Sequence, residues 1–328
     1  MLSSSYKTLD LKTSSCLKGI LACMVLLCHL YGRVGFFSST PLGAVFTAFG
    51  YLAVSVFFFL SGFGLTEAAS LKEGYLKNFP LKKLFPFFLI CSFTILIYLI
   101  RDILVGSTVK PLLLIQSFLF GNTIVNNGWY LQSHFVFYII FYLIFRFIKS
   151  HTYLALVVSF IAYIFICVAL GLSSTWYEAA FCFPLGVFYS KYKDKIHCFI
   201  FANKLKPIIA LLFILILFVI ALFLGNRPYF VEPIRITVKI ISALLFCCLC
   251  TLSVLLVNIK NAITSFLGRL SLEIYLLQGI FLNLFQKTWP IENDLLYIVA
   301  VVLCTILFAI VFHPIYNKLS KPNFCSKK

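Results

Sequence analysis

Two ionisable residues near the N-terminus have types and a spacing that could support acid–base chemistry. Lys18 and His29 are eleven residues apart, and almost every residue between them is apolar. On an α-helix, eleven steps of about 100° make three turns plus about 20°, so both side chains share one face, about 16 Å apart along the axis. Burial disfavours the charged imidazolium, so we expect His29 to be neutral and able to accept a proton from a hydroxyl group.

A structural interpretation of the same two residues stays open. His29 could hydrogen-bond a neighbouring helix, and Lys18 could be a snorkelling anchor at the membrane surface. Ionisable groups at bilayer depth are nevertheless functional candidates by default, because burying them is costly.

The elements that position these residues are predicted to be membrane-spanning helices. The 328 residues are 62% hydrophobic and only 11% charged, a composition that excludes a soluble domain. We therefore predict an all-α polytopic membrane protein, a single membrane-embedded domain over residues 1–328. About ten apolar stretches are predicted to be spans: Gly19–Phe37, Leu42–Thr66, Leu84–Leu104, Trp129–Phe147, Tyr153–Leu172, Trp176–Tyr189, Pro207–Leu224, Pro233–Val257, Leu270–Phe285 and Leu295–Phe312.

The formal net charge of +17 is explained by basic clusters between these stretches, as the positive-inside rule requires, and it does not indicate nucleic-acid binding. The apolar piece Pro111–Phe120 is too short to span easily, so we expect a re-entrant or interfacial segment. Counting it as a span would place the largest basic cluster, from Lys191 to Lys206, outside. The charges thus predict cytoplasmic tails over residues 1–16 and 317–328, and we expect the protein to lie in the plasma membrane.

Six motifs, in order along nearly the whole chain, resemble those of acyltransferase family 3, a family of integral-membrane O-acyltransferases. The first is the basic residue Lys18 followed by His29, which is similar to the basic-x10-His motif of that family. The others are Val54–Gly64 (VSVFFFLSGFG), Tyr75–Pro86 (YLKNFPLKKLFP), Gly128–Leu131 (GWYL), Phe183–Gly186 (FPLG) and Gly268–Leu276 (GRLSLEIYL).

The resemblance implies that acyl-CoA approaches from the cytoplasm and that His29 is the catalytic histidine. It also implies that Lys18 helps to hold the CoA, although many relatives have arginine there and lysine lacks the bidentate fork for phosphate. Lys82 and Lys83 are cations at the membrane face where CoA phosphates would arrive, and they could equally be anchors for anionic lipid. The small residues Gly62 and Gly64 are expected to permit close helix packing or to leave room for the pantetheine arm.

Three residues are candidates for binding the acceptor. Trp129 could stack on a substrate or belong to the aromatic belt of the membrane interface. Glu178 could hydrogen-bond a sugar or orient an imidazole. Gln278 stands where relatives often carry histidine, and it can bind a substrate but cannot act as an acid or base. His313, near the end of the last span, is interpreted as a snorkelling or capping residue.

The resemblance thus predicts transfer of an acyl group, most simply acetyl, from acyl-CoA to a hydroxyl of a cell-surface carbohydrate or lipid-linked glycan. Acyl-CoA is expected as a co-substrate, membrane lipids as surroundings, and neither a resident cofactor nor a metal is predicted. The alternative is a transporter or exporter of a lipid or glycan precursor, although no paired inverted halves are evident in the sequence. The oligomeric state does not follow from these patterns.

Overall fold

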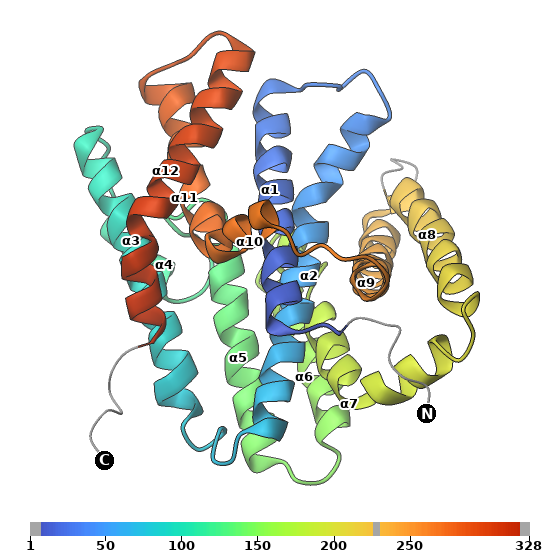
Figure 1. Ribbon diagram of the computed structural model, residues 1–328. Coiled ribbons are helices and arrows are strands. Elements are labelled where there is room, and N and C mark those ends of the chain that lie inside the picture. The colour runs from blue at the N-terminus through green and yellow to red at the C-terminus, as the bar shows by residue number, and fades with distance from the viewer. Residues whose placement is uncertain (1–7, 226–229, 322–328) are drawn as a thin grey trace. The chain divides into compact units, whose positions relative to one another are not determined.

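Every regular element in the described residues is a helix, as predicted. The computed structural model of the chain describes residues 8–225 and 230–321 (Figure 1). The α-helices are α1 (Leu11–Val34), α2 (Leu42–Leu71), α3 (Phe85–Leu104), α4 (Pro111–Phe118), α5 (Trp129–Phe147), α6 (Thr152–Ala169), α7 (Cys182–Ile200), α8 (Lys206–Gly225), α9 (Glu232–Leu256), α10 (Ala262–Arg269), α11 (Ser271–Asn283) and α12 (Asp294–Ser320). Short helical turns of other types are η1 (Pro80–Leu84), η2 (Ser174–Trp176) and η3 (Leu284–Thr288).

Eight helices of the described residues are long and apolar enough to cross a membrane, and a ninth span is possible as a broken one. The eight are α1, α2, α3 together with η1, α5, α6, α8, α9 and α12. The broken span joins α10 to α11 and η3 with a bend of 69°. These helices confirm a polytopic membrane protein. The short helix α4 also agrees with the expectation that this segment does not span, since eight residues extend only about 12 Å.

The sixth predicted span, Trp176–Tyr189, was wrong as a continuous helix. The chain makes a 3₁₀ turn at Ser174–Trp176 and further turns, and helix α7 begins only at Cys182. Non-helical backbone at membrane depth requires partners within the protein. Trp176 is buried here, and its carbonyl accepts a hydrogen bond of 3.0 Å from the Tyr163 hydroxyl.

Helix α1 begins and ends earlier than the predicted span Gly19–Phe37, because a side-chain cap fixes its start and a glycine fixes its end. The Asp10 carboxylate caps the first turn by accepting from the Thr13 amide at 2.7 Å, and Gly35 ends the helix with a φ of 72°. Residues 11–16 are therefore helical. At the other end of the chain, α12 continues to Ser320.

The chain forms two compact units. The first comprises the described parts of Met1–Tyr31, Gly35–Glu73 and Val157–Arg269. Its centre is the contact between α2 and α7, where a Cβ added to Gly62 would lie 2.2 Å from the Phe183 carbonyl oxygen. A Cβ added to Gly186 would lie 2.0 Å from the Phe59 carbonyl oxygen. The expectation that Gly62 permits close packing is confirmed, whereas a Cβ on Gly64 would meet nothing within 4 Å.

Helices α2 and α7 run in the same direction. Phe183 faces Gly62, and about two to three turns after Phe183 in α7 the side chains of Ser190 and Lys193 bind Glu67, at 2.6 Å and 2.5 Å respectively. The end of α7 that carries the basic cluster therefore lies at the same end of the first unit as the C-terminal end of α2.

The second unit comprises Gly32–Val34, Gly74–Leu156 and the described part of Leu270–Lys328. Helix α3 packs against α12 and α11. The buried Thr94 hydroxyl lies 2.9 Å from the Tyr316 hydroxyl, and the Tyr98 hydroxyl donates to the Leu276 carbonyl at 2.9 Å. These bonds satisfy polar groups inside an otherwise apolar bundle.

Candidate active site

Lys18 and His29 occupy one uninterrupted helix, α1. Because the helix has no break between them, the two residues lie on the same face of α1, as their spacing predicts, about 16 Å apart along the axis. Both side chains are half-buried. Near His29, helix α1 contacts α2 closely: the Cys28 thiol donates to the Thr47 carbonyl at 3.6 Å, and a Cβ on Gly50 would lie 3.1 Å from the Cys28 sulfur.

The seven predicted site residues fall in both units. Lys18, His29 and Glu178 belong to the first unit, and Lys82, Lys83, Trp129 and Gln278 belong to the second. Lys82 and Lys83 lie in η1, a π-helical turn that begins at Pro80 and leads into α3. Both side chains are exposed, so their ammonium groups can reach a ligand or a lipid at the end of this helix.

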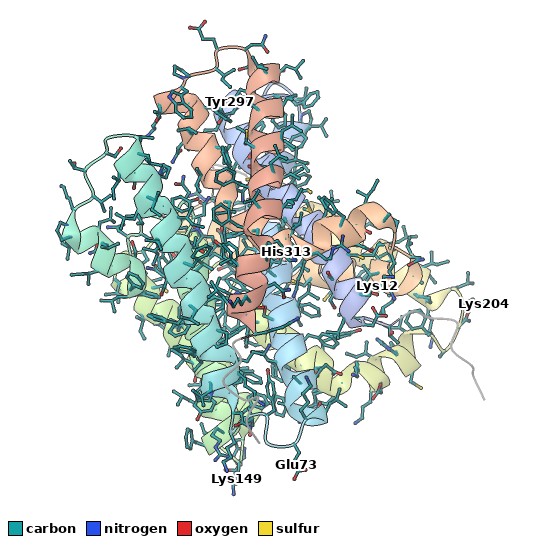
Figure 2. The ribbon with its side chains drawn as sticks, turned by 60° about the vertical axis from the view of Figure 1, so that its left-hand side comes forward. Lys12, Glu73, Lys149, Lys204, Tyr297 and His313 are labelled. Carbon is teal, nitrogen blue, oxygen red and sulfur yellow. The ribbon has the colours of Figure 1, made fainter. Side chains whose placement is uncertain are left out.

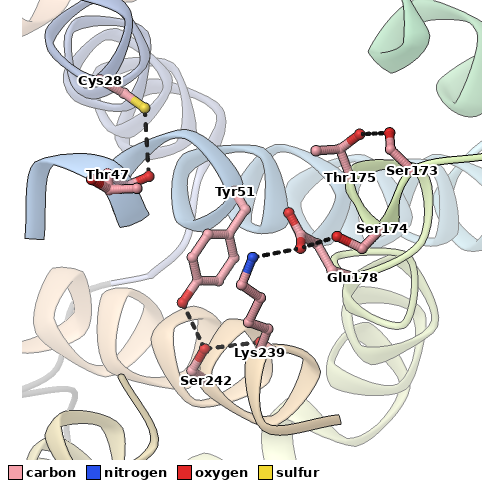
Figure 3. Close-up of polar contacts among 9 residues, drawn as sticks. All are labelled: Cys28, Thr47, Tyr51, Ser173, Ser174, Thr175, Glu178, Lys239 and Ser242. Atoms are coloured by element: carbon pink, nitrogen blue, oxygen red, sulfur yellow. Dashed lines mark hydrogen bonds and ion pairs between the residues drawn. The ribbon is translucent and has the colours of Figure 1, made fainter. Parts of the chain in front are cut away.

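Glu178 lies within a polar cluster of the first unit (Figure 3). Its side chain is almost completely buried, and its Oε2 atom accepts from the Ser174 hydroxyl at 3.2 Å and from Lys239 Nζ at 3.3 Å. One turn along α9, the Ser242 hydroxyl lies 2.9 Å from that of Tyr51. The carboxylate therefore already has a cationic partner inside the protein, which suits a buried charge.

Gln278 is buried in α11 with only half of its amide satisfied. Its Nε2 atom donates to the Tyr275 carbonyl at 3.1 Å, while its Oε1 atom has no hydrogen-bond partner among the described residues. A buried acceptor of this kind can take a hydrogen bond from a ligand hydroxyl. Trp129 is the first residue of α5, half-buried, with its ring edge-to-face with Tyr130 at 6.4 Å.

His313 does not merely cap or snorkel. Figure 2 shows it in the second half of α12, and its Nδ1 atom lies 2.7 Å from the Oε1 atom of Glu273 in α11. The Glu273 side chain is 3% exposed. No local sequence signal pairs these residues, because they lie on different helices 40 positions apart.

Arg33 is a further polar residue that the sequence motifs did not single out. It lies four residues after His29 in α1 and belongs to the second unit, within which its two terminal nitrogens bind Asn283 and Gln286. The signal that could have found it is its i, i+4 spacing from His29, which places both on one helix face.

Comparison with protein families decides the class of the chain. A family model described as an acyltransferase domain matches residues 12–313. The chain belongs to acyltransferase family 3. Among curated proteins and among solved structures, no significant match was found.

Membership covers nearly the whole chain, so the family assignment applies to both units and not to one motif alone. The protein is therefore an acyltransferase built into a multi-pass membrane domain, as the helices of the structure also require. The donor, the acceptor and the roles of individual residues are not fixed by family membership.

Proposed function

We propose that this protein of acyltransferase family 3 transfers an acetyl group from acetyl-CoA to a hydroxyl of a cell-surface carbohydrate or its lipid-linked precursor. The observation that carries the proposal is the unbroken α1, which holds an ammonium group and an imidazole on one face of a single membrane-spanning helix. This arrangement offers a cation for a phosphate-bearing donor and a base for a hydroxyl acceptor.

His29 acts as the general base in this proposal. It takes the proton of the acceptor hydroxyl while the hydroxyl oxygen attacks the carbonyl carbon of the thioester. The carbon–sulfur bond then breaks, and the CoA thiolate takes the proton back from the imidazolium. No covalent enzyme intermediate is needed, so direct transfer is the simplest form of the reaction.

The donor reaches His29 from the end of α1 at which Lys18 lies, which we assign to the cytoplasmic face of the plasma membrane. Lys18 binds a phosphate of CoA, and the exposed Lys82 and Lys83 add positive charge for its other phosphates. The acceptor binds from the membrane or the outer face. The unsatisfied Oε1 atom of Gln278 supports a role in binding an acceptor hydroxyl, while stacking by Trp129 and hydrogen bonding by Glu178 complete the proposed contacts.

The test uses purified protein supplied with acetyl-CoA and a glycan acceptor, with free CoA and acetylated product measured together. Wild-type protein is expected to release CoA in proportion to product, and His29→Ala to release at least about a hundredfold less. Movement of a glycan precursor across proteoliposomes without acetylated product would instead favour an exporter and contradict the proposal.

A further inference from the structure

Arg33 lies at the end of α1 opposite Lys18 and on the same face as His29. Four residues correspond to about 400°, so Arg33 is turned by about 40° from His29 and lies about 6 Å further along the axis. Lys18, His29 and Arg33 therefore form a line in which a cation stands on each side of the imidazole.

The guanidinium of Arg33 is held in one position by neutral amides. Its Nη1 atom donates to the Oε1 atom of Gln286, and its Nη2 atom donates to the Oδ1 atom of Asn283 at 3.0 Å. Gln286 lies in the π-helical turn η3, which directly follows Asn283, the last residue of α11. Single π turns of this kind often occur at functional sites.

The amides that hold Arg33 are themselves anchored in the second unit. Asn283 donates from Nδ2 to the Oδ1 atom of Asn126 at 3.1 Å. Asn126 packs directly on α11, because a Cβ added to Gly279 would lie 2.3 Å from its Cβ. The loop that carries Asn126 is fixed by the Ile124 amide, which donates to the Ser117 hydroxyl at 3.0 Å.

No carboxylate among the described residues neutralises the charge of Arg33. Within residues 8–225 and 230–321, the ion pairs involve other residues, and none joins Arg33 to a carboxylate. Two of the five guanidinium N–H donors bind the amides, which leaves three for a ligand. The side chain is exposed. An exposed guanidinium that is fixed in position, and that has no counter-ion in the part of the chain that the structure describes, is suited to bidentate binding of an oxyanion.

We propose that Arg33, positioned by Asn283 and Gln286, binds the phosphate of an amphiphilic acceptor. Phosphate is the anion expected here because α1 has 24 residues and Arg33 is the last but one, which places it at the headgroup level of a bilayer. The assignment to the acceptor rests on the proposed function, since the phosphate then lies one helical turn from His29. The sugar attached to that phosphate is the one presented to the imidazole.

Direct binding measures this site without turnover. Detergent-purified protein is titrated calorimetrically with farnesyl phosphate and with farnesol, the neutral match. Arg33→Gln is expected to weaken farnesyl phosphate binding at least about tenfold and to leave farnesol binding unchanged. Lys110→Gln, which removes the same charge from an exposed residue directly before α4, serves as the matched control. Equal affinity of Arg33→Gln and wild type for farnesyl phosphate would overturn the proposal.

A second variant keeps the arginine and its charge. Gln286→Ala removes one of the two amides that hold the guanidinium, so a loss of affinity of about two- to tenfold is expected. Because Gln286 is exposed, this variant is expected to fold even if Arg33→Gln does not. Unchanged phosphate binding by folded Gln286→Ala would show that the amides do not position Arg33 and would overturn that part of the proposal.

Two further measurements are needed. One distinguishes an acceptor phosphate from a lipid headgroup, and the other distinguishes failure of the phosphate site from failure of the proposed function. Phosphatidic acid that displaces farnesyl phosphate at equal concentration would assign the site to lipid headgroups and overturn its assignment to the acceptor. His29→Ala is expected to bind farnesyl phosphate as wild type does. If Arg33→Gln loses phosphate binding while His29→Ala still transfers acetyl groups, the phosphate site stands and the proposed function fails. If Arg33→Gln binds farnesyl phosphate as wild type does while His29→Ala transfers no acetyl groups, the proposed function stands and the phosphate site fails.

Discussion

Only 11% of the residues are charged, so the role of a single charged residue such as Lys18 can be tested by one substitution. Lys18 and Lys12 lie on the same helix, but six residues turn Lys12 by about 240°, away from the face of His29. We predict that Lys18→Gln raises the KM for acetyl-CoA about tenfold with little change in kcat, because it removes a phosphate contact made equally in the ground and transition states. Lys18→Arg should restore acetyl-CoA binding, since arginine keeps the positive charge and can bind a phosphate with two parallel hydrogen bonds.

Lys12→Gln is the matched control for this measurement. It removes the same charge from the same helix but from another face, so the KM for acetyl-CoA should stay within about twofold of wild type. Equal rises in KM for Lys12→Gln and Lys18→Gln would show that only the overall charge of the surface matters, and would contradict a specific role for Lys18.

Asp10 gives a pH-dependent prediction for the start of α1. Burial opposes its ionisation, but hydrogen bonds from Lys260, at 2.6 Å, and from Thr13 outweigh burial and lower the pKa of Asp10 from 3.8 to about 2. Because the folded-state pKa is the lower one, the stabilisation is complete above about pH 4 and is lost as the pH falls through 2. Asp10→Ala should therefore cost about 1 kcal/mol near pH 7 as a lost helix cap.

Thermal unfolding of the detergent-solubilised protein at pH 7 and near pH 2 measures this effect. Asp10→Asn should lose less than Asp10→Ala at pH 7, because asparagine still caps a helix, whereas an exposed ion pair contributes little. Most of the difference in Tm between wild type and Asp10→Ala should disappear near pH 2. A difference of the same size at both pH values would show that the charge of Asp10 is not involved.

At the residue scale, the sequence could predict which residues share a helix face, but not which distant residues bind one another. The relation of Lys18 to His29 depends only on helical geometry, so their spacing along the chain is enough to predict it. The partners of Arg33 could not be predicted in this way, because Asn283 and Gln286 are about 250 positions away and amides occur in many loops. The pairing of His313 with Glu273 escapes sequence patterns for the same reason.

At the scale of elements, the contact between α2 and α7 depends on glycine. The close approaches of Gly186 to Phe59 and of Gly62 to Phe183 leave no room for a methyl group. We predict that Gly186→Ala lowers the stability by about 1–3 kcal/mol, because backbone atoms would have to move apart. Thermal unfolding in detergent, followed by circular dichroism, reports this loss.

Gly64→Ala is the matched control, two residues from Gly62 on the same helix. A Cβ there meets nothing within 4 Å, so the substitution should be neutral or stabilise the helix by up to about 1 kcal/mol. If Gly64→Ala and Gly186→Ala destabilise the protein equally, close packing is not the reason for glycine in this contact.

The elements also show why one predicted span was wrong. Residues 176–189 are apolar enough to suggest a helix, but apolarity reports burial and not backbone conformation. The turns before Cys182 are buried against α6 through Tyr163, a contact between distant segments that hydropathy cannot reveal. Likewise, hydropathy does not reveal that η1, which carries Lys82 and Lys83, and η3, which carries Gln286, depart from α-helical geometry.

At the scale of the whole molecule, composition and motif order were sufficient to predict an all-α polytopic membrane protein and its family. They could not predict the division into two units or the bend of 69° between α10 and α11, because both depend on long-range packing. Broken helices commonly line functional sites in membrane proteins, where their free backbone groups find partners.

The membrane topology gives a prediction within the first unit. Because α7 runs parallel to α2, Lys204 should face the side of the membrane opposite to Thr40, which precedes α2. A fluorescent protein that folds only in the cytoplasm should be bright when fused after Lys204 and dark when fused after Thr40, as the positive-inside rule requires. Fluorescence of both fusions, or of only the fusion after Thr40, would contradict this topology.

The most direct test of the proposed chemistry is the rate of acetyl transfer by purified His29→Gln protein, measured with labelled acetyl-CoA and a glycan acceptor. Glutamine fills a similar space and keeps hydrogen-bonding groups but cannot accept the proton, so kcat should fall by a factor of about 10² to 10⁴. His151→Gln, at an exposed position, should keep wild-type activity. A His29→Gln protein that folds and transfers acetyl groups at the wild-type rate would contradict the central claim that His29 is the base.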